Sequence, residues 1–172
     1  MGMDIYGVSP TEEVGEYFRR NVWGWRPLWN YVEDLHPEIA KFVEYPQSND
    51  GDGLSRMRSI QLADLLDGDI ESGRAQEYID TRDRVIAEIP MESCEFCEAT
   101  GIRTDEVGVN NGMPERELDK ETAEKVGRTH GTCNGCNGLG EREPFQRWYF
   151  LNLDDIKEFS AFIRASGGFE IN

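Results

Sequence analysis

The stretch Cys133-Asn134-Gly135-Cys136-Asn137-Gly138-Leu139-Gly140 follows the pattern Cys-x-x-Cys-x-Gly-x-Gly. A second octad, Cys94-Glu95-Phe96-Cys97-Glu98-Ala99-Thr100-Gly101, has the same plan with Ala99 in place of the first glycine. Glycines suit such turns, because backbone amides that curl around sulfur atoms need positive φ angles, which a residue without Cβ adopts at least cost. The repeat therefore predicts two matched turns around the thiols.

The spacing of the cysteines is typical of a structural zinc site. The two octads contain all four cysteines of the 172-residue chain. Two thiolates on one tight turn can face the same ion, and a second such turn completes the tetrahedron of sulfurs that zinc prefers. The sequence therefore predicts one Zn²⁺ ion per chain, with Cys94, Cys97, Cys133 and Cys136 as its ligands.

Both octads resemble motifs of the DnaJ-type cysteine-rich zinc domain. That domain has four such motifs and two zinc ions, so two motifs imply at most one ion here. The chain has no His-Pro-Asp tripeptide and no glycine-phenylalanine linker. The resemblance therefore implies the local zinc knuckle and no co-chaperone activity.

A wider resemblance covers nearly the whole chain, to a group of proteins found in bacterial and phage genomes. It is carried by residues 1–7, 17–23, 25–28, 49–54 and 162–171. This resemblance allows a phage-encoded protein, and it implies no particular activity.

Other chemistries of the cysteines and histidines are less well supported. A redox dithiol would sit at the strand-to-helix junction of a βαβ unit and would need one Cys-x-x-Cys pair, whereas this chain has two. A zinc-stapled nuclease would need histidines at catalytic spacing, and His36 and His130 are far apart. His130 could replace one cysteine as a ligand, since it lies three residues before Cys133.

The carboxylates do not identify a catalytic pair. Asp50 and Asp52 precede Gly53, but a calcium loop aligned on this glycine would have serine at its first and last positions, Ser48 and Ser59. We therefore expect no calcium site, no catalytic residues and no organic cofactor.

The charge of the chain limits its partners. It has 34 acidic and 18 basic residues, a net charge of −16. Exchanging four thiol protons for one Zn²⁺ makes the net charge two units more negative. Such a field repels nucleic acids and anionic membranes. We expect a cytoplasmic, zinc-binding, non-enzymatic accessory or adaptor protein that contacts other proteins. The alternatives are an acidic inhibitor that mimics nucleic acid and a small zinc-stapled enzyme.

Hydrophobic periodicity predicts an α+β fold, mainly helical, with small terminal strands and an inserted zinc-knuckle hairpin. The expected body is 1–92 with 141–172, and the insert is 93–140, with a mobile connection at 102–132 and a possible helix at 114–125. We expect strands at 3–6, 147–151 and 169–171, and helices at 10–20, 29–35, 54–66, 75–89 and 153–165. The last strand is expected beside either the N-terminal strand or the strand at 147–151.

Overall fold

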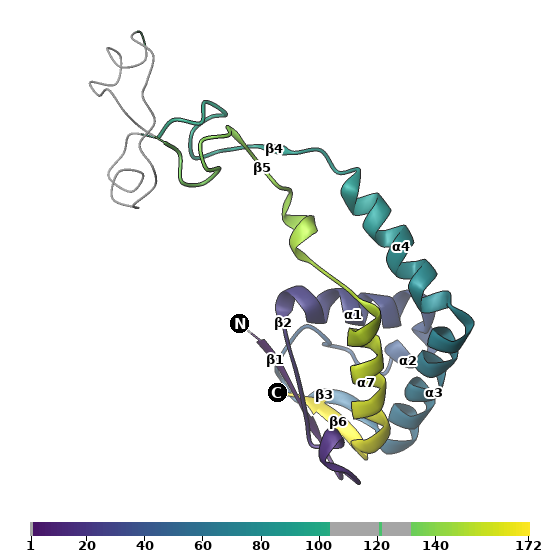
Figure 1. Ribbon diagram of the computed structural model, residues 1–172. Helices are drawn as coiled ribbons and strands as arrows, with labels where there is room; N and C mark the ends of the chain where they lie inside the picture. The colour runs from purple at the N-terminus through teal and green to yellow at the C-terminus, as the bar shows by residue number, and fades with distance from the viewer. Residues whose placement is uncertain (1, 104–120, 122–131) are drawn as a thin grey trace. The chain divides into compact units, whose positions relative to one another are not determined.

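The computed structural model describes residues 2–103, 121 and 132–172 (Figure 1). By its contacts the chain divides into two compact units, one comprising Met1–Ala87 with Gln146–Asn172, the other Glu88–Phe145. The expected insert, 93–140, lies inside the second unit. The expected mobile connection and the helix at 114–125 lie outside the described residues, except at positions 102, 103, 121 and 132.

The first unit contains a four-stranded antiparallel sheet. Its strands are β1 (Gly2–Gly7), β2 (Tyr17–Asn21), β3 (Asp52–Ser55) and β6 (Gly168–Ile171), in the order β2-β1-β6-β3. Ile5 lies opposite Phe18 on one side and Ile171 on the other, and all three are buried. The closing strand therefore pairs with the N-terminal strand, which was one of its two expected neighbours.

The expectation of a short helix before Asn21 is wrong. Only a single 3-10 turn, η1 (Glu13–Gly15), forms there, and the chain then continues as β2. Gly15 lies so close to the end of the last helix that a Cβ atom would be 2.3 Å from the carbonyl carbon of Ala165. This contact and the pairing of β2 with β1 override the local helical pattern, because they satisfy the backbone and bury Phe18.

Helix α1 (Val22–Leu35) supplies much of the core. The Asn21 side chain caps it by accepting a hydrogen bond of 2.9 Å from the amide of Gly24. Trp25 and Trp29 are fully buried and belong to the hydrophobic core of this unit. A short helix, α2 (Pro37–Ala40), follows.

Helix α3 (Arg56–Ser72) is longer than expected. Gly68 lies inside it, and a Cβ atom added to Gly68 would have no neighbour within 4 Å, so this glycine costs about 1 kcal/mol without ending the helix. The helix ends instead at Gly73, which has φ +81° and forms a left-handed cap. Helix α4 (Arg74–Ala87) then ends before Pro90, as expected.

Helix α7 (Leu153–Ala165) was expected with these bounds. Asn152 accepts from the amide of Asp155 and the Asp155 side chain accepts from the amide of Asn152, a complete capping box. The helix packs on α3 and, in Figure 1, lies between α3 and the sheet. Between α7 and the sheet, the buried rings of Phe159 and Phe162 contact the ring of Phe169 on β6.

The expectation of a strand at 147–151 is also wrong. The segment begins with a 3-10 turn, η2 (Phe145–Trp148), and continues without regular structure. Its aromatic residues pack edge-on against Trp23, with ring centroids at 5.7 Å for Trp148 and 5.0 Å for Tyr149. Side-chain packing on α1 thus replaces the strand pairing that the composition favoured. Within the described residues, no helix has the length and apolar character needed to span a bilayer.

Candidate metal centre

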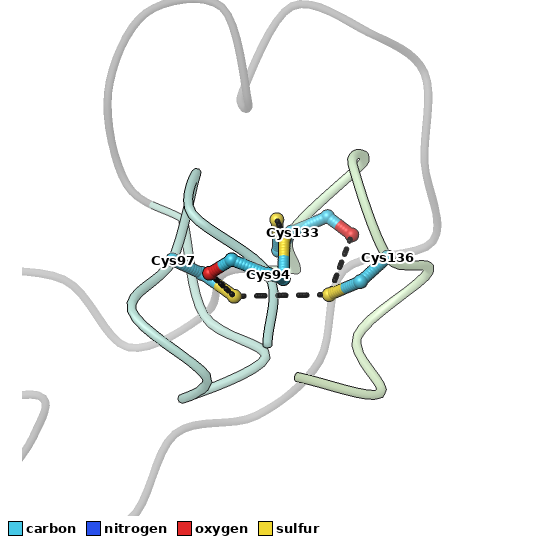
Figure 2. A group of neighbouring side chains, drawn as sticks. All are labelled: Cys94, Cys97, Cys133 and Cys136. Atoms are coloured by element: carbon cyan, nitrogen blue, oxygen red, sulfur yellow. Dashed lines mark hydrogen bonds between the residues drawn. The ribbon is translucent and has the colours of Figure 1, made fainter. Parts of the chain in front are cut away.

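The four cysteine sulfurs lie together in the second unit. All four Sγ atoms are within 4.8 Å of one another, and each cysteine is buried (Figure 2). Cys94 and Cys133 bring their sulfurs to 3.7 Å, as do Cys97 and Cys136. A disulfide bond would be about 2.05 Å long, whereas a tetrahedron with metal–sulfur bonds of about 2.3 Å has edges of about 3.8 Å. The cluster has the dimensions of a four-sulfur metal site.

The two cysteine turns are joined by backbone pairing. Strands β4 (Glu92–Ser93) and β5 (Glu141–Arg142) form a short antiparallel ladder at their base. Beyond it, the amide of Cys94 donates to the carbonyl of Gly140 at 2.8 Å, and the amide of Cys133 donates to that of Gly101 at 2.9 Å. Each turn therefore begins on the last glycine of the other, which gives the pair an approximate twofold arrangement.

Backbone amides also point at the second sulfur of each turn. The amide of Gly101 donates to Cys97 Sγ at 3.3 Å, and the amide of Gly140 donates to Cys136 Sγ at 3.2 Å. Hydrogen bonds of this kind stabilise thiolates more than thiols, because the thiolate carries the negative charge. The turns are thus built to hold sulfur in its metal-binding form.

The conformation of the turns explains the glycines. Gly101, Gly138 and Gly140 have φ between +73° and +80°, and Ala99, which stands in place of the first glycine in its octad, has φ +66°. A Cβ atom on Gly101 would be 2.3 Å from the carbonyl oxygen of Gly138, and one on Gly140 would be 2.3 Å from that of Ala99. The last glycine of each octad is therefore required by both backbone angle and space.

Burial opposes ionisation of the thiols in the absence of a cation. It raises the pKa of Cys133 to about 12 and also raises the pKa of Cys97. For Cys136, burial likewise acts upward, but the amide of Gly140 and the neighbouring thiols outweigh it and lower the pKa. Four thiolates cannot share this buried space without a positive ion, since each would repel the others at low dielectric. A bound metal cation would supply the missing charge.

The outer surface of the metal centre carries two exposed apolar side chains. Phe96 is 55% exposed, with its ring over the Gly135 turn and the Arg103 guanidinium 5.2 Å from its centroid. Leu139, in the other octad, is 76% exposed. Neither side chain is a metal ligand, and both expose apolar surface to water.

Two further residues were considered as metal ligands, His130 and Asp52. His130 lies outside the described residues. The two carboxylate oxygens of Asp52 accept hydrogen bonds from the amides of Tyr45 at 2.7 Å and Gly53 at 2.8 Å, so Asp52 orders its loop. Within the described part of the chain, the four cysteines are the group of Cys, His and acidic side chains close enough to share an ion.

A buried polar cluster in the first unit was not predicted from the sequence. Oδ2 of Asp69 accepts a hydrogen bond of 2.6 Å from the Tyr31 hydroxyl and lies 2.7 Å from His36 Nε2, while Oδ1 lies 3.3 Å from Arg74 Nη1. The signal was the position of Asp69 on the apolar stripe of α3, seven residues after Leu62. Because Tyr31, His36 and Asp69 are all buried, the cluster is closed to substrates, and its hydrogen bond from Tyr31 to Asp69 connects α1 to α3.

Comparisons with known proteins leave the family of the chain open: no family model, no curated protein and no solved structure matches it. The chemistry of the four-cysteine cluster and its surroundings is therefore the basis for assigning a function.

Proposed function

We propose that Cys94, Cys97, Cys133 and Cys136 bind one structural Zn²⁺ ion. The observation that carries the proposal is the close approach of four buried sulfurs, two pairs of which are 3.7 Å apart. Four thiolate ligands and tetrahedral dimensions favour zinc over hard cations such as magnesium or calcium, which take oxygen ligands. With four protein ligands the coordination sphere is closed, so the ion holds the two turns together and leaves no position for a substrate.

Elemental analysis of reduced, freshly purified protein tests the metal and its number. We expect one zinc per chain, and less than half of that in Cys136→Ser. Ser93→Ala is the matched control, because Ser93 is an exposed neighbour of the site that contributes no sulfur. Protein that contains no zinc, or that contains iron with visible absorbance, would refute the proposal.

We further propose that the protein is a non-enzymatic adaptor whose zinc centre presents a contact surface to another protein. Phe96 and Leu139 support this role, because exposed apolar side chains held on a rigid metal centre are suited to anchoring a partner. The net charge of −16 favours a partner with a basic surface.

Comparative affinity capture tests the adaptor role. Tagged wild-type protein and the variants Leu139→Ala and Met57→Ala are used in parallel on extracts of the native host. Met57 is 75% exposed but lies on α3 in the other unit, so it controls for loss of a surface apolar group. We expect Leu139→Ala to lose a partner that Met57→Ala retains. Identical captured proteins from all three would contradict this part of the proposal.

A further inference from the structure

A small cavity in the first unit differs in its chemistry from the rest of the chain. Its volume is about 240 Å³. The lining residues are Arg26, Pro27, Asn30, Gln47, Arg82 and Tyr149. Five of these six side chains carry hydrogen-bond donors, and none carries a carboxylate. In a chain with 34 acidic and only 18 basic residues, a lining with two arginines and no acid is unusual.

Four separate segments bring these donors together. Arg26 and Asn30 are one turn apart on α1, so their side chains project from the same face. Arg82 comes from α4, Gln47 from the loop before β3, and Tyr149 from the segment after η2. The tertiary fold, and not one local motif, therefore creates the site.

Tyr149 organises the two arginines. Nη1 of Arg26 donates to the Tyr149 hydroxyl at 2.8 Å, and Nη2 of Arg82 donates to the Tyr149 carbonyl oxygen. Edge-on contact with Trp23, at 5.0 Å between centroids, holds the phenol ring in place. Tyr149 thus offers each guanidinium group a neutral acceptor at the cavity.

The charges of the two arginines are balanced to different extents. Arg82 Nη1 lies 3.1 Å from the carboxylate of Asp83, which is itself largely exposed. Arg26 forms no ion pair with any carboxylate of the described residues, and its side chain is exposed. Its bond to a neutral hydroxyl uses one of five N–H donors, and a guanidinium with donors to spare matches the oxygens of phosphate.

We propose that this cavity binds a phosphate group, either as inorganic phosphate or as the head of a small phosphate monoester. Arg26 is the principal ligand, with Asn30 and Gln47 as amide donors and Arg82 as the second cation. The acidic surface elsewhere does not prevent this, because exposed charges beyond about 8 Å are screened at physiological salt whereas direct contacts are not. The proposed phosphate site shares no residue with the zinc site, since all of its residues lie in the first unit.

Isothermal titration of the full-length, zinc-loaded protein with inorganic phosphate tests the proposal at constant ionic strength. We expect saturable binding of one phosphate per chain, weakened about tenfold or more in Arg26→Gln. Arg84→Gln is the matched control, because Arg84 also lies on α4 but donates to Thr81 and lines none of the cavity. The affinity of Arg84→Gln for phosphate should equal that of the wild type.

A second variant and two further ligands complete the test. Asn30→Ala should also weaken binding, and circular dichroism shows whether each variant is folded, so the conclusion stands even if Arg26→Gln does not fold. Glycerol phosphate that binds more tightly than inorganic phosphate would identify a monoester as the ligand class, and the reverse would identify the free ion. Acetate binding as strongly as phosphate, no saturable phosphate binding, or equal losses in Arg26→Gln and Arg84→Gln would each overturn the proposal.

Discussion

Replacing Gly140 by alanine should damage the metal centre far more than the same change at Gly138. Both glycines have positive φ, +80° and +79°, so alanine at either position costs about 1–2 kcal/mol of backbone energy. At Gly140 the new Cβ would also lie 2.3 Å from the carbonyl oxygen of Ala99. Relief of this clash must move the backbone, and with it the amide that donates to Cys136 Sγ at 3.2 Å.

The expected losses of zinc affinity follow from these terms. Loss of a hydrogen bond to a charged sulfur costs about 1.5–3 kcal/mol. Added to the backbone term, this gives a total of about 2.5–5 kcal/mol for Gly140→Ala, or roughly two to four orders of magnitude in affinity. For Gly138→Ala we count the backbone term, about 5-fold to 30-fold, because Ala99 at the corresponding position of the first octad carries a Cβ atom at a similar backbone angle.

Competition with a chromophoric zinc chelator, in reducing buffer at fixed pH, measures these affinities. Ala99→Gly is a third variant, in which loss of the Cβ atom at φ +66° relieves about 1–2 kcal/mol of backbone energy. The greater freedom of glycine offsets about 0.5–1 kcal/mol of this, so zinc affinity should be unchanged or up to about tenfold higher. Equal affinities for Gly140→Ala and Gly138→Ala would refute the reasoning, because they would show that the close approach to Ala99 does not constrain the site.

Three further predictions concern the whole chain. Removal of zinc with a strong chelator should leave most of the helical circular dichroism, because α1, α3 and α7 pack in the first unit without the cysteines; loss of most of it would show that the units fold together. In urea denaturation, Asp69→Ala should lower the free energy of unfolding by about 3–5 kcal/mol, since it leaves Tyr31 and His36 buried without their acceptor; a loss below about 1 kcal/mol would contradict the role of the cluster. Burial, and then the hydrogen bond to Asp69, raises the pKa of Tyr31 above its usual 10. The contribution of Tyr31 to the free energy of unfolding is therefore complete below pH 10. It is lost as the pH rises further, by up to about 1.4 kcal/mol per pH unit. Unfolding measured between pH 9 and about pH 11 should show this decline, and Tyr31→Phe should reduce its slope; an unchanged slope in the variant would assign the decline to other groups.

Local signals in the sequence were sufficient for several elements. Helix α7 was expected with its observed bounds, because Asn152 can cap its first turn and glycines follow its last turn. The structure adds Asp155 as the second member of a capping box. The mainly helical α+β class followed from the same periodicity. The octads indicated which cysteines would lie together and why glycines follow them, since ligand spacing and backbone angles are properties of a few neighbouring residues.

Only the tertiary structure decided the features that depend on distant contacts. Strand β2 exists because β1 offers its edge and Gly15 permits a close approach, and neither condition can be read from residues 17–21 alone. The partners of Asp69 and the donors around Arg26 come from segments far apart in the chain. The physical reason is that propensities and caps act over a few residues, whereas strand pairing, buried charge and cavity chemistry depend on which surfaces the folded chain brings together.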